Sequence, residues 1–116
     1  MKLIKFNNIK FYIGENAKDN WELLDKSKEI NENYIWFHLN SFPSPYVIMY
    51  ATMDDIKTLR NSYLNYGGII CLENSKYSYL HDTKIIYSEL KKLKKGDKVG
   101  EIVISGKKKL MKIILP

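Results

Sequence analysis

The sequence predicts an α+β fold with a single, mostly antiparallel sheet and two to three helices. Short segments rich in Ile, Val, Tyr and Phe recur along the chain, and turn residues separate several of them. Two longer segments carry apolar residues at helical spacing. A chain of 116 residues can bury one hydrophobic core but has no room for two, so we expect one domain over residues 1–116.

The first thirty residues predict a hairpin followed by a helix. Residues 2–6 and 9–13 are short, apolar and β-rich, and the asparagine pair between them suits a tight turn. After Gly14 the apolar residues move to helical spacing and charged residues occupy the other faces. We therefore expect a helix over residues 17–28 with Asn16 as its N-cap.

The middle of the chain predicts two strands and a second helix. The strands are expected at residues 34–39 and 46–51, joined by a loop with two prolines that lie outside both strand interiors. Residues 53–64 carry an apolar stripe at helical spacing and predict the helix. The glycine pair at 67–68 either ends that helix and begins a strand at 69–72, or lets a helix approach the sheet closely. Local rules favour the strand.

The last third of the chain predicts three strands, at residues 84–88, 100–105 and 109–115. We expect residues 106–108 to join the last two strands as a short hairpin. The lysine-rich segment between the first two strands should form a loop or a short helical turn, with Leu90 and Leu93 pointing inward.

The positive charge of the chain is concentrated at one end. The net charge is +6, yet residues 84–116 alone carry +7 and the remaining residues carry −1. A local excess of this kind fits a surface that binds a polyanion. A solvated, lysine-rich edge that protects exposed strands is the plainer alternative, and charge alone leaves both open.

The sequence lacks the motifs of common enzymes and metal sites. It has no glycine-rich phosphate loop and no HExxH spacing, and His38 and His81 are its only histidines. The single cysteine, Cys71, excludes an internal disulfide and a cysteine-based zinc site. A pair of Cys71 with a histidine in space stays open. We expect no enzymatic activity, no cofactor and no metal.

The apolar segments are too short for a membrane span or a signal peptide. Residues 1–14 alternate lysines with apolar residues, and no run approaches the roughly 18 apolar residues that a membrane helix needs. We therefore expect a soluble, cytoplasmic protein with no membrane partner.

Three segments, in order, carry the motifs of one family. They are GENAKDNWELL at 14–24, YIWFHLNSFPSPYVI at 34–48 and KIIYSELKKLKKGDKVGEIVI at 84–104. Together they resemble the NFACT-R domain, the RNA-binding module of ribosome-quality-control proteins related to NEMF and RqcH. The first segment matches the family's G-x-N-A-x-x-N opening, and the second matches its hydrophobic-W-F-H segment followed by a proline turn.

The resemblance implies a nucleic-acid-binding module, but not the elongation of stalled peptides that the larger family members support. It also implies a helix over roughly residues 62–74, against the strand that the local pattern favours. Three positions depart from the family: Tyr34 stands where an aspartate is usual, and Pro45-Tyr46 replaces a serine-histidine pair. A tyrosine still offers a ring for stacking and a hydroxyl for hydrogen bonding, but no titratable imidazole.

Two groups of residues form the candidate binding surface. Because side chains alternate along a strand, Trp36 should share a face with His38, and Phe37 the opposite face with Leu39. One group is expected around the proline loop at the end of the sheet, and its members are His38, Ser44 and Tyr46. Asn16 and Asn20 match the family motif, and the resemblance makes them further candidates. For the two asparagines, a helix cap and a solvated polar residue are the plainer readings.

The second group consists of lysines that would follow a phosphate backbone without reading bases. Its members are Lys91, Lys92, Lys94, Lys95, Lys107, Lys108 and Lys109. Stacking could come from Tyr46, Tyr77, Tyr79 and Tyr87. We expect structured RNA, tRNA or ribosomal RNA, as the ligand, with the ribosome as a further partner. The alternatives are an adaptor that docks on a ribosome-associated protein, and a non-specific DNA binder.

Overall fold

The computed structural model describes residues 1–115, which form an α+β domain with two sheets and two α-helices. The predicted fold class is confirmed, with a small second sheet added to the single one expected. In chain order the elements are β1 (Lys2–Phe6), β2 (Ile9–Ile13), α1 (Ala17–Ile30), β3 (Ile35–Leu39), β4 (Val47–Met49), the 3₁₀ turn η1 (Lys57–Leu59), α2 (Arg60–Glu73), β5 (Lys84–Glu89), the 3₁₀ turn η2 (Leu90–Lys92), β6 (Leu93–Lys95), β7 (Ile102–Ile104) and β8 (Lys109–Lys112). The large sheet has the order β1-β2-β4-β3-β5-β8 with antiparallel pairs, and β6 and β7 form the small sheet.

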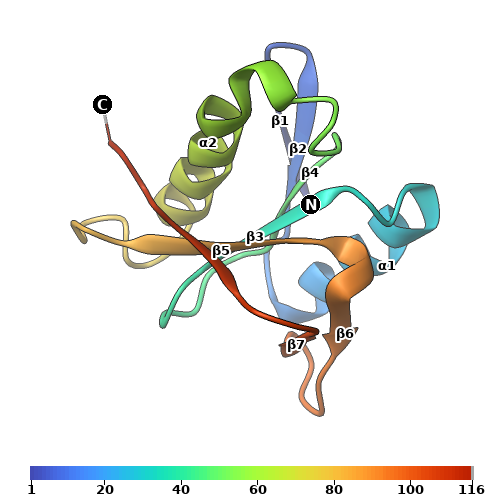
Figure 1. Cartoon of the computed structure of the whole chain (residues 1–116). Helices are drawn as coiled ribbons and strands as arrows, with labels where there is room; N and C mark the ends of the chain where they lie inside the picture. Colours follow the sequence, from blue (N-terminus) through green and yellow to red (C-terminus); the bar gives the residue numbers. More distant parts are fainter. Residues whose placement is uncertain (116) are drawn as a thin grey trace.

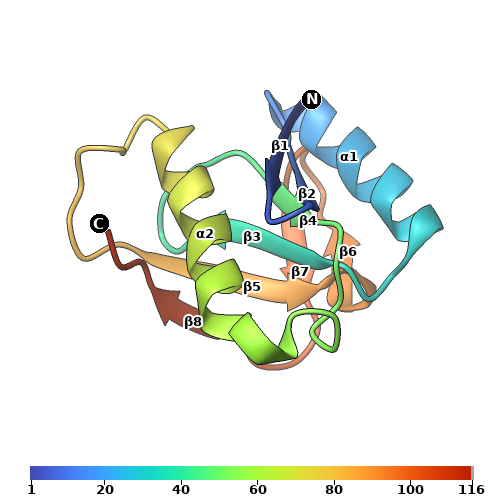
Figure 2. The ribbon, with the colours of Figure 1, turned by 90° about the horizontal axis from the view of Figure 1, so that it is seen from above.

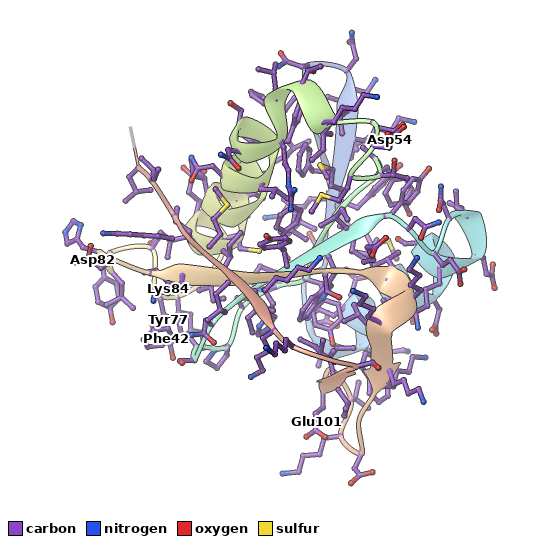
Figure 3. The ribbon with its side chains drawn as sticks, viewed as in Figure 1. Phe42, Asp54, Tyr77, Asp82, Lys84 and Glu101 are labelled. Atoms are coloured by element: carbon purple, nitrogen blue, oxygen red, sulfur yellow. The ribbon has the colours of Figure 1, made fainter. Side chains whose placement is uncertain are left out.

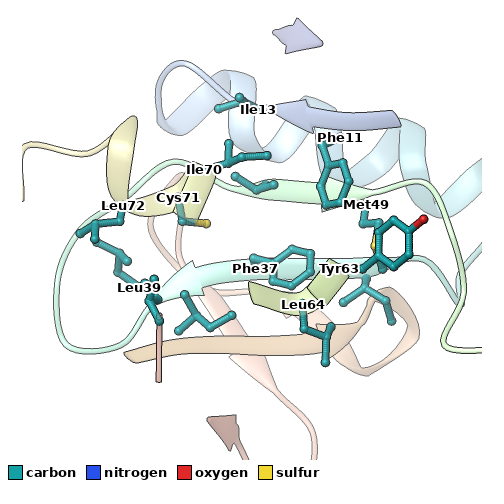
Figure 4. Close-up of a cluster of buried hydrophobic side chains, with 14 of the residues drawn as sticks. Phe11, Ile13, Phe37, Leu39, Met49, Tyr63, Leu64, Ile70, Cys71 and Leu72 are labelled. Atoms are coloured by element: carbon teal, nitrogen blue, oxygen red, sulfur yellow. The ribbon is translucent and has the colours of Figure 1, made fainter. Parts of the chain in front are cut away.

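The central strands of the large sheet, β3 and β4, are buried on both faces. Phe37 and Leu39 of β3 enter the core that α2 covers, whereas Trp36 enters a second core beneath α1 and the small sheet. The rings of Trp36 and His38 stack 5.4 Å apart, so the predicted sharing of faces is confirmed. Figure 1 shows β3 and β5 across the molecule with α2 on one side and β6 and β7 on the other. Figure 4 shows the first of these cores.

The predicted hairpin and first helix are confirmed. Asn7 and Asn8 both adopt positive φ angles, 49° and 67°, which a two-residue turn between twisted antiparallel strands needs. The Asp19 N–H donates to Asn16 Oδ1 at 2.8 Å, so Asn16 caps α1 as expected. The helix continues to Ile30, two residues beyond the predicted end.

The predicted helix over 53–64 is wrong in its first half and confirmed only from Arg60 onward, and the predicted strand at 69–72 is wrong. Thr52 and Asp55 exchange hydrogen bonds that form a turn, and α2 begins only at Arg60 and runs through both glycines to Glu73. The helix implied by the family resemblance is confirmed. A Cβ on Gly67 would lie 2.6 Å from the Phe37 ring, so the small residues let the helix backbone rest on β3. This close packing outweighs the cost of about 1 kcal/mol per glycine in a helix.

The predicted hairpin between the last two strands is also wrong. β7 pairs with β6, and β8 pairs with the edge of β5, so residues 105–108 cross from the small sheet to the large one. Figure 2 shows β8 beside β5, apart from β7. Leu90 and Leu93 are fully buried, as predicted, and they anchor η2 and β6 over the second core. Between residues 1 and 115, neither helix has the length and apolar character of a membrane span.

Candidate nucleic-acid interface

The loop between β3 and β4 borders a hollow of about 710 Å³ at one end of the large sheet. Its other walls are the start of α1, the segment after α2 and residues 99–100 of the β6–β7 loop. We call it the α1 hollow. It brings together the predicted group His38, Ser44 and Tyr46. Asn16 and Asn20 also line it, although the sequence did not predict their position beside that group.

A second hollow of about 540 Å³ lies beside the first and is walled by β7. We call it the β7 hollow. His38 and Tyr46 line both hollows, and Lys108 lines the β7 hollow together with Glu101 and Val103. The proline loop and part of the lysine group therefore meet at His38.

Tyr46 lies between the two hollows and lines both. Its side chain is 1 % exposed, and its hydroxyl donates to the Gly100 carbonyl at 2.5 Å. Its ring meets the rings of Trp36 and His38 edge-on, at 5.5 and 6.0 Å. Burial raises the pKa of the Tyr46 hydroxyl, which stays protonated. The expected stacking of Tyr46 on a base is wrong for this arrangement, because the ring is covered and instead ties the β6–β7 loop to the sheet.

His38 is a neutral hydrogen-bond acceptor at this site. Its Nδ1 lies 2.9 Å from the Leu39 carbonyl, which can only accept, so Nδ1 carries the proton. The other ring nitrogen, Nε2, keeps its lone pair and has no partner within residues 1–115. Burial lowers the pKa of His38 although the Leu39 carbonyl opposes the shift, so the ring is uncharged at neutral pH.

Asn20 is held under the proline loop by a gap that a glycine leaves. Its side chain is 7 % exposed, and its Oδ1 accepts the Tyr46 N–H at 3.2 Å. A Cβ on Gly14 would lie 1.8 Å from that oxygen, so only glycine leaves room for it. The reading of Asn20 as a solvated polar residue is wrong. Gly14 and Asn20 are the first and last residues of the motif at 14–20, but their contact could not be predicted from the sequence.

Ser44 and Asn16 use their side chains to shape the backbone. Ser44 Oγ accepts the Leu39 N–H at 3.0 Å and donates to the Pro45 carbonyl, which fixes the loop. Asn16 caps α1, as described above. Sequence reasoning missed Lys2 and Lys76, which also line the α1 hollow, because neither belongs to a lysine run.

The seven candidate lysines do not form one group. Lys95 pairs with Asp25 at 2.5 Å and lies over the Trp21 ring, while Lys91 and Lys92 lie 3.6 and 4.0 Å from Glu89. Within the described chain, four have no carboxylate within 4 Å: Lys94, Lys107, Lys108 and Lys109.

One of these four, Lys108, lines the β7 hollow. Lys94 pairs with Val103, and because side chains alternate along a strand, both point away from the core that Leu93, Ile102 and Ile104 face. Lys109 faces Tyr87 on β5 and lies toward the opposite face of the sheet. Glu101 contributes a negative charge, but its Oε1 accepts the Asp97 N–H and holds the turn between β6 and β7 (Figure 3).

Cys71 does not pair with His38, which was one of the two histidines that the sequence left possible as a partner. Cys71 is fully buried in the core beneath α2, and His38 lies on the other face of the sheet. Burial raises the pKa of the Cys71 thiol, which disfavours a reactive thiolate. No cluster of three or more His, Cys, Asp or Glu side chains in residues 1–115 could hold a metal ion.

Comparison with known proteins shows the fold. No protein-family model matches the chain, and no curated protein matches it. Its structure is similar to the solved C-terminal part of the fibronectin/fibrinogen-binding protein from Streptococcus suis, with a TM-score of 0.70 and 24% sequence identity. The match covers 90% of this chain and 40% of that chain, so this chain spans less than half of the solved one.

Proposed function

We propose that this chain is a non-enzymatic, cytoplasmic RNA-binding module of NFACT-R type. It would hold structured RNA, such as tRNA or ribosomal RNA, and serve translation or ribosome quality control. The observation that carries the proposal is the meeting of Lys108 and His38 at the β7 hollow. Lys108 belongs to the lysine-rich third of the chain, and His38 belongs to the second motif segment.

The unpaired lysines supply the attraction for phosphates. An ammonium without a carboxylate partner exchanges only water and counterions when it meets a phosphate, whereas Lys95 would first have to leave Asp25. Lysine recognises phosphate as a point charge without strict geometry, which suits backbone contact. The surface therefore favours affinity for a polyanion over base readout.

The salt dependence of binding measures how many lysines contact phosphates. Four phosphate contacts give a slope of log affinity against log salt of about −3.6, and seven give about −6. With four contacts, binding weakens on the order of a hundredfold between about 50 and 200 mM salt. The measurement is fluorescence anisotropy of labelled tRNA and of duplex DNA.

A matched pair of variants assigns the contacts. Lys107→Ala with Lys108→Ala should lower the slope by about 1.8, because two phosphate contacts are lost. Lys5→Ala with Lys10→Ala removes the same charge from exposed sites on β1 and β2 and should leave the slope unchanged. Equal losses in the two double variants would refute a localised surface.

A protein-docking role is the second candidate function. Val99, Val103 and Leu110 are each about half exposed around the lysine surface, at 56 %, 56 % and 46 %. Apolar side chains among cations suit a protein partner as well as an RNA. No binding to tRNA or to DNA at low salt would favour this adaptor role. The similar solved structure comes from a fibronectin/fibrinogen-binding protein, so fibronectin serves as one protein ligand in the assay. Equal affinity for tRNA and DNA would reduce the proposal to a general polyanion surface.

A further inference from the structure

The α1 hollow contains hydrogen-bonding groups that the fold itself leaves unused. The Asn20 amide is oriented by its bond from the Tyr46 N–H, which fixes Oδ1 as the acceptor and leaves Nδ2 with two N–H groups. Nδ2 has no partner within residues 1–115, although the side chain is more than nine-tenths buried. Nδ2 is not among the fully enclosed polar atoms without a partner, so a ligand in the hollow that Asn20 lines can reach it.

His38 supplies the complementary group. Its Nδ1–H is used by the Leu39 carbonyl, and its Nε2 is a free acceptor on a ring that lines the same hollow. One wall of the hollow therefore offers a donor and an acceptor. A nucleobase edge presents the same pair in reverse, a ring or carbonyl acceptor next to an N–H donor.

The α1 hollow also contains an aromatic ring. Tyr77 lines the α1 hollow, is half-buried, and packs against Phe42 with ring centroids 4.8 Å apart (Figure 3). Phe42 thus supports one side of a ring that can stack on a base. Lys2 and Lys76 also line this hollow and can meet the phosphates on either side of that base. A volume of about 710 Å³ lies within the range of small-ligand sites.

We infer that the α1 hollow takes an unpaired nucleobase of the bound RNA, hydrogen-bonded by Asn20 and His38 and stacked on Tyr77. The inference rests on the proposed function, since it assigns a substrate feature to the same surface. His38 lines both hollows, so a strand with a phosphate at Lys108 passes directly beside the α1 hollow. The β7 hollow then holds the backbone and the α1 hollow holds a base.

The test compares two fluorescein-labelled oligonucleotides of the same length and charge. One is a ten-nucleotide adenosine RNA, and the other lacks the bases at its four central positions. The readout is the ratio of their dissociation constants at fixed low salt, because electrostatic attraction is common to both and cancels. We expect the wild-type protein to bind the base-bearing RNA about tenfold more tightly.

Two variants ask whether the hollow is the cause. Asn20→Asp keeps an oxygen for the Tyr46 N–H but replaces the free N–H groups, and Tyr77→Leu removes the stacking ring. Each should bring the ratio close to one. Lys18→Gln makes the same change of charge as Asn20→Asp on an exposed site of α1 and should keep the ratio. Thermal melts followed by circular dichroism check that each variant folds. If Asn20→Asp does not fold, the ratio measured for Tyr77→Leu alone tests the base site.

The possible outcomes distinguish a failure of the base site from a failure of the proposed RNA-binding function. A wild-type ratio of one with steep salt dependence overturns the base site and leaves the RNA-binding function standing. A tenfold ratio that neither variant changes also overturns it, because the base is then bound elsewhere. No binding of either oligonucleotide at low salt removes both the inference and the proposed function.

Discussion

Replacing Gly14 with alanine tests how the candidate interface is built. The new Cβ would lie 1.8 Å from Asn20 Oδ1, so the Asn20 side chain must turn away and release the Tyr46 N–H. A buried N–H left without a partner costs about 1–3 kcal/mol. Against this, alanine reduces the entropy of the unfolded chain and returns about 0.4–1 kcal/mol. The net expectation is a loss of about 1–2 kcal/mol.

Thermal unfolding followed by circular dichroism measures this loss. For a chain of 116 residues, 1 kcal/mol corresponds to about 4 °C, so the melting temperature of Gly14→Ala should fall by about 4–8 °C. The double variant Gly14→Ala/Asn20→Ala supplies the control. In the Asn20→Ala background the oxygen is gone, so the glycine substitution should change the melting temperature little. If Gly14→Ala costs as much in both backgrounds, the steric link to Asn20 is refuted.

Three more predictions concern other contacts of the site and the core. Tyr46→Phe removes the hydrogen bond from the hydroxyl to the Gly100 carbonyl and should lower the free energy of unfolding by about 1 kcal/mol. An unchanged midpoint in urea unfolding would show that this hydrogen bond does not stabilise the fold. Since burial lowers the pKa of His38, the unfolded chain binds the proton more readily, and stability should fall as the pH drops below the usual histidine value near 6.5. This fall should end below the folded-state pKa, and His38→Gln should flatten it while His81→Gln, at an exposed position, should not. Gly67→Ala forces a Cβ against the buried Phe37 ring and should cost about 1–3 kcal/mol, whereas alanine at the exposed Gly106 turn, where no atom lies within 4 Å, should be limited to the strain of its positive φ.

The division of the lysines has a consequence for engineering the surface. Lys91, Lys92 and Lys95 stabilise η2, β6 and α1 through Glu89 and Asp25, so their removal changes local structure as well as charge. Lys107 and Lys108 are exposed on the crossing segment and carry no such pairs among the described residues. Substitutions at the second pair therefore report on ligand binding more directly.

Some of this structure follows from neighbouring residues alone. The asparagine turn between β1 and β2, the Asn16 cap of α1 and the alternation of Trp36 and Phe37 each depend on residues within a few positions of one another. Their signals are local and the sequence contains them in full. The fold class follows from the sum of such signals.

The rest was decided by contacts between distant residues. Local propensity favoured a strand after Gly67-Gly68, and only the sheet beneath, with Phe37 and Ile85 against the glycine backbone, makes the segment a helix. Residues 106–108 look like a hairpin, but β5 has an open edge that β8 occupies, and β7 is taken by β6. Whether a lysine is paired, and whether it lies beside His38, likewise depends on where separate strands meet. The charged residues can be counted from a sequence, but the face of the molecule on which they lie depends on the folded chain.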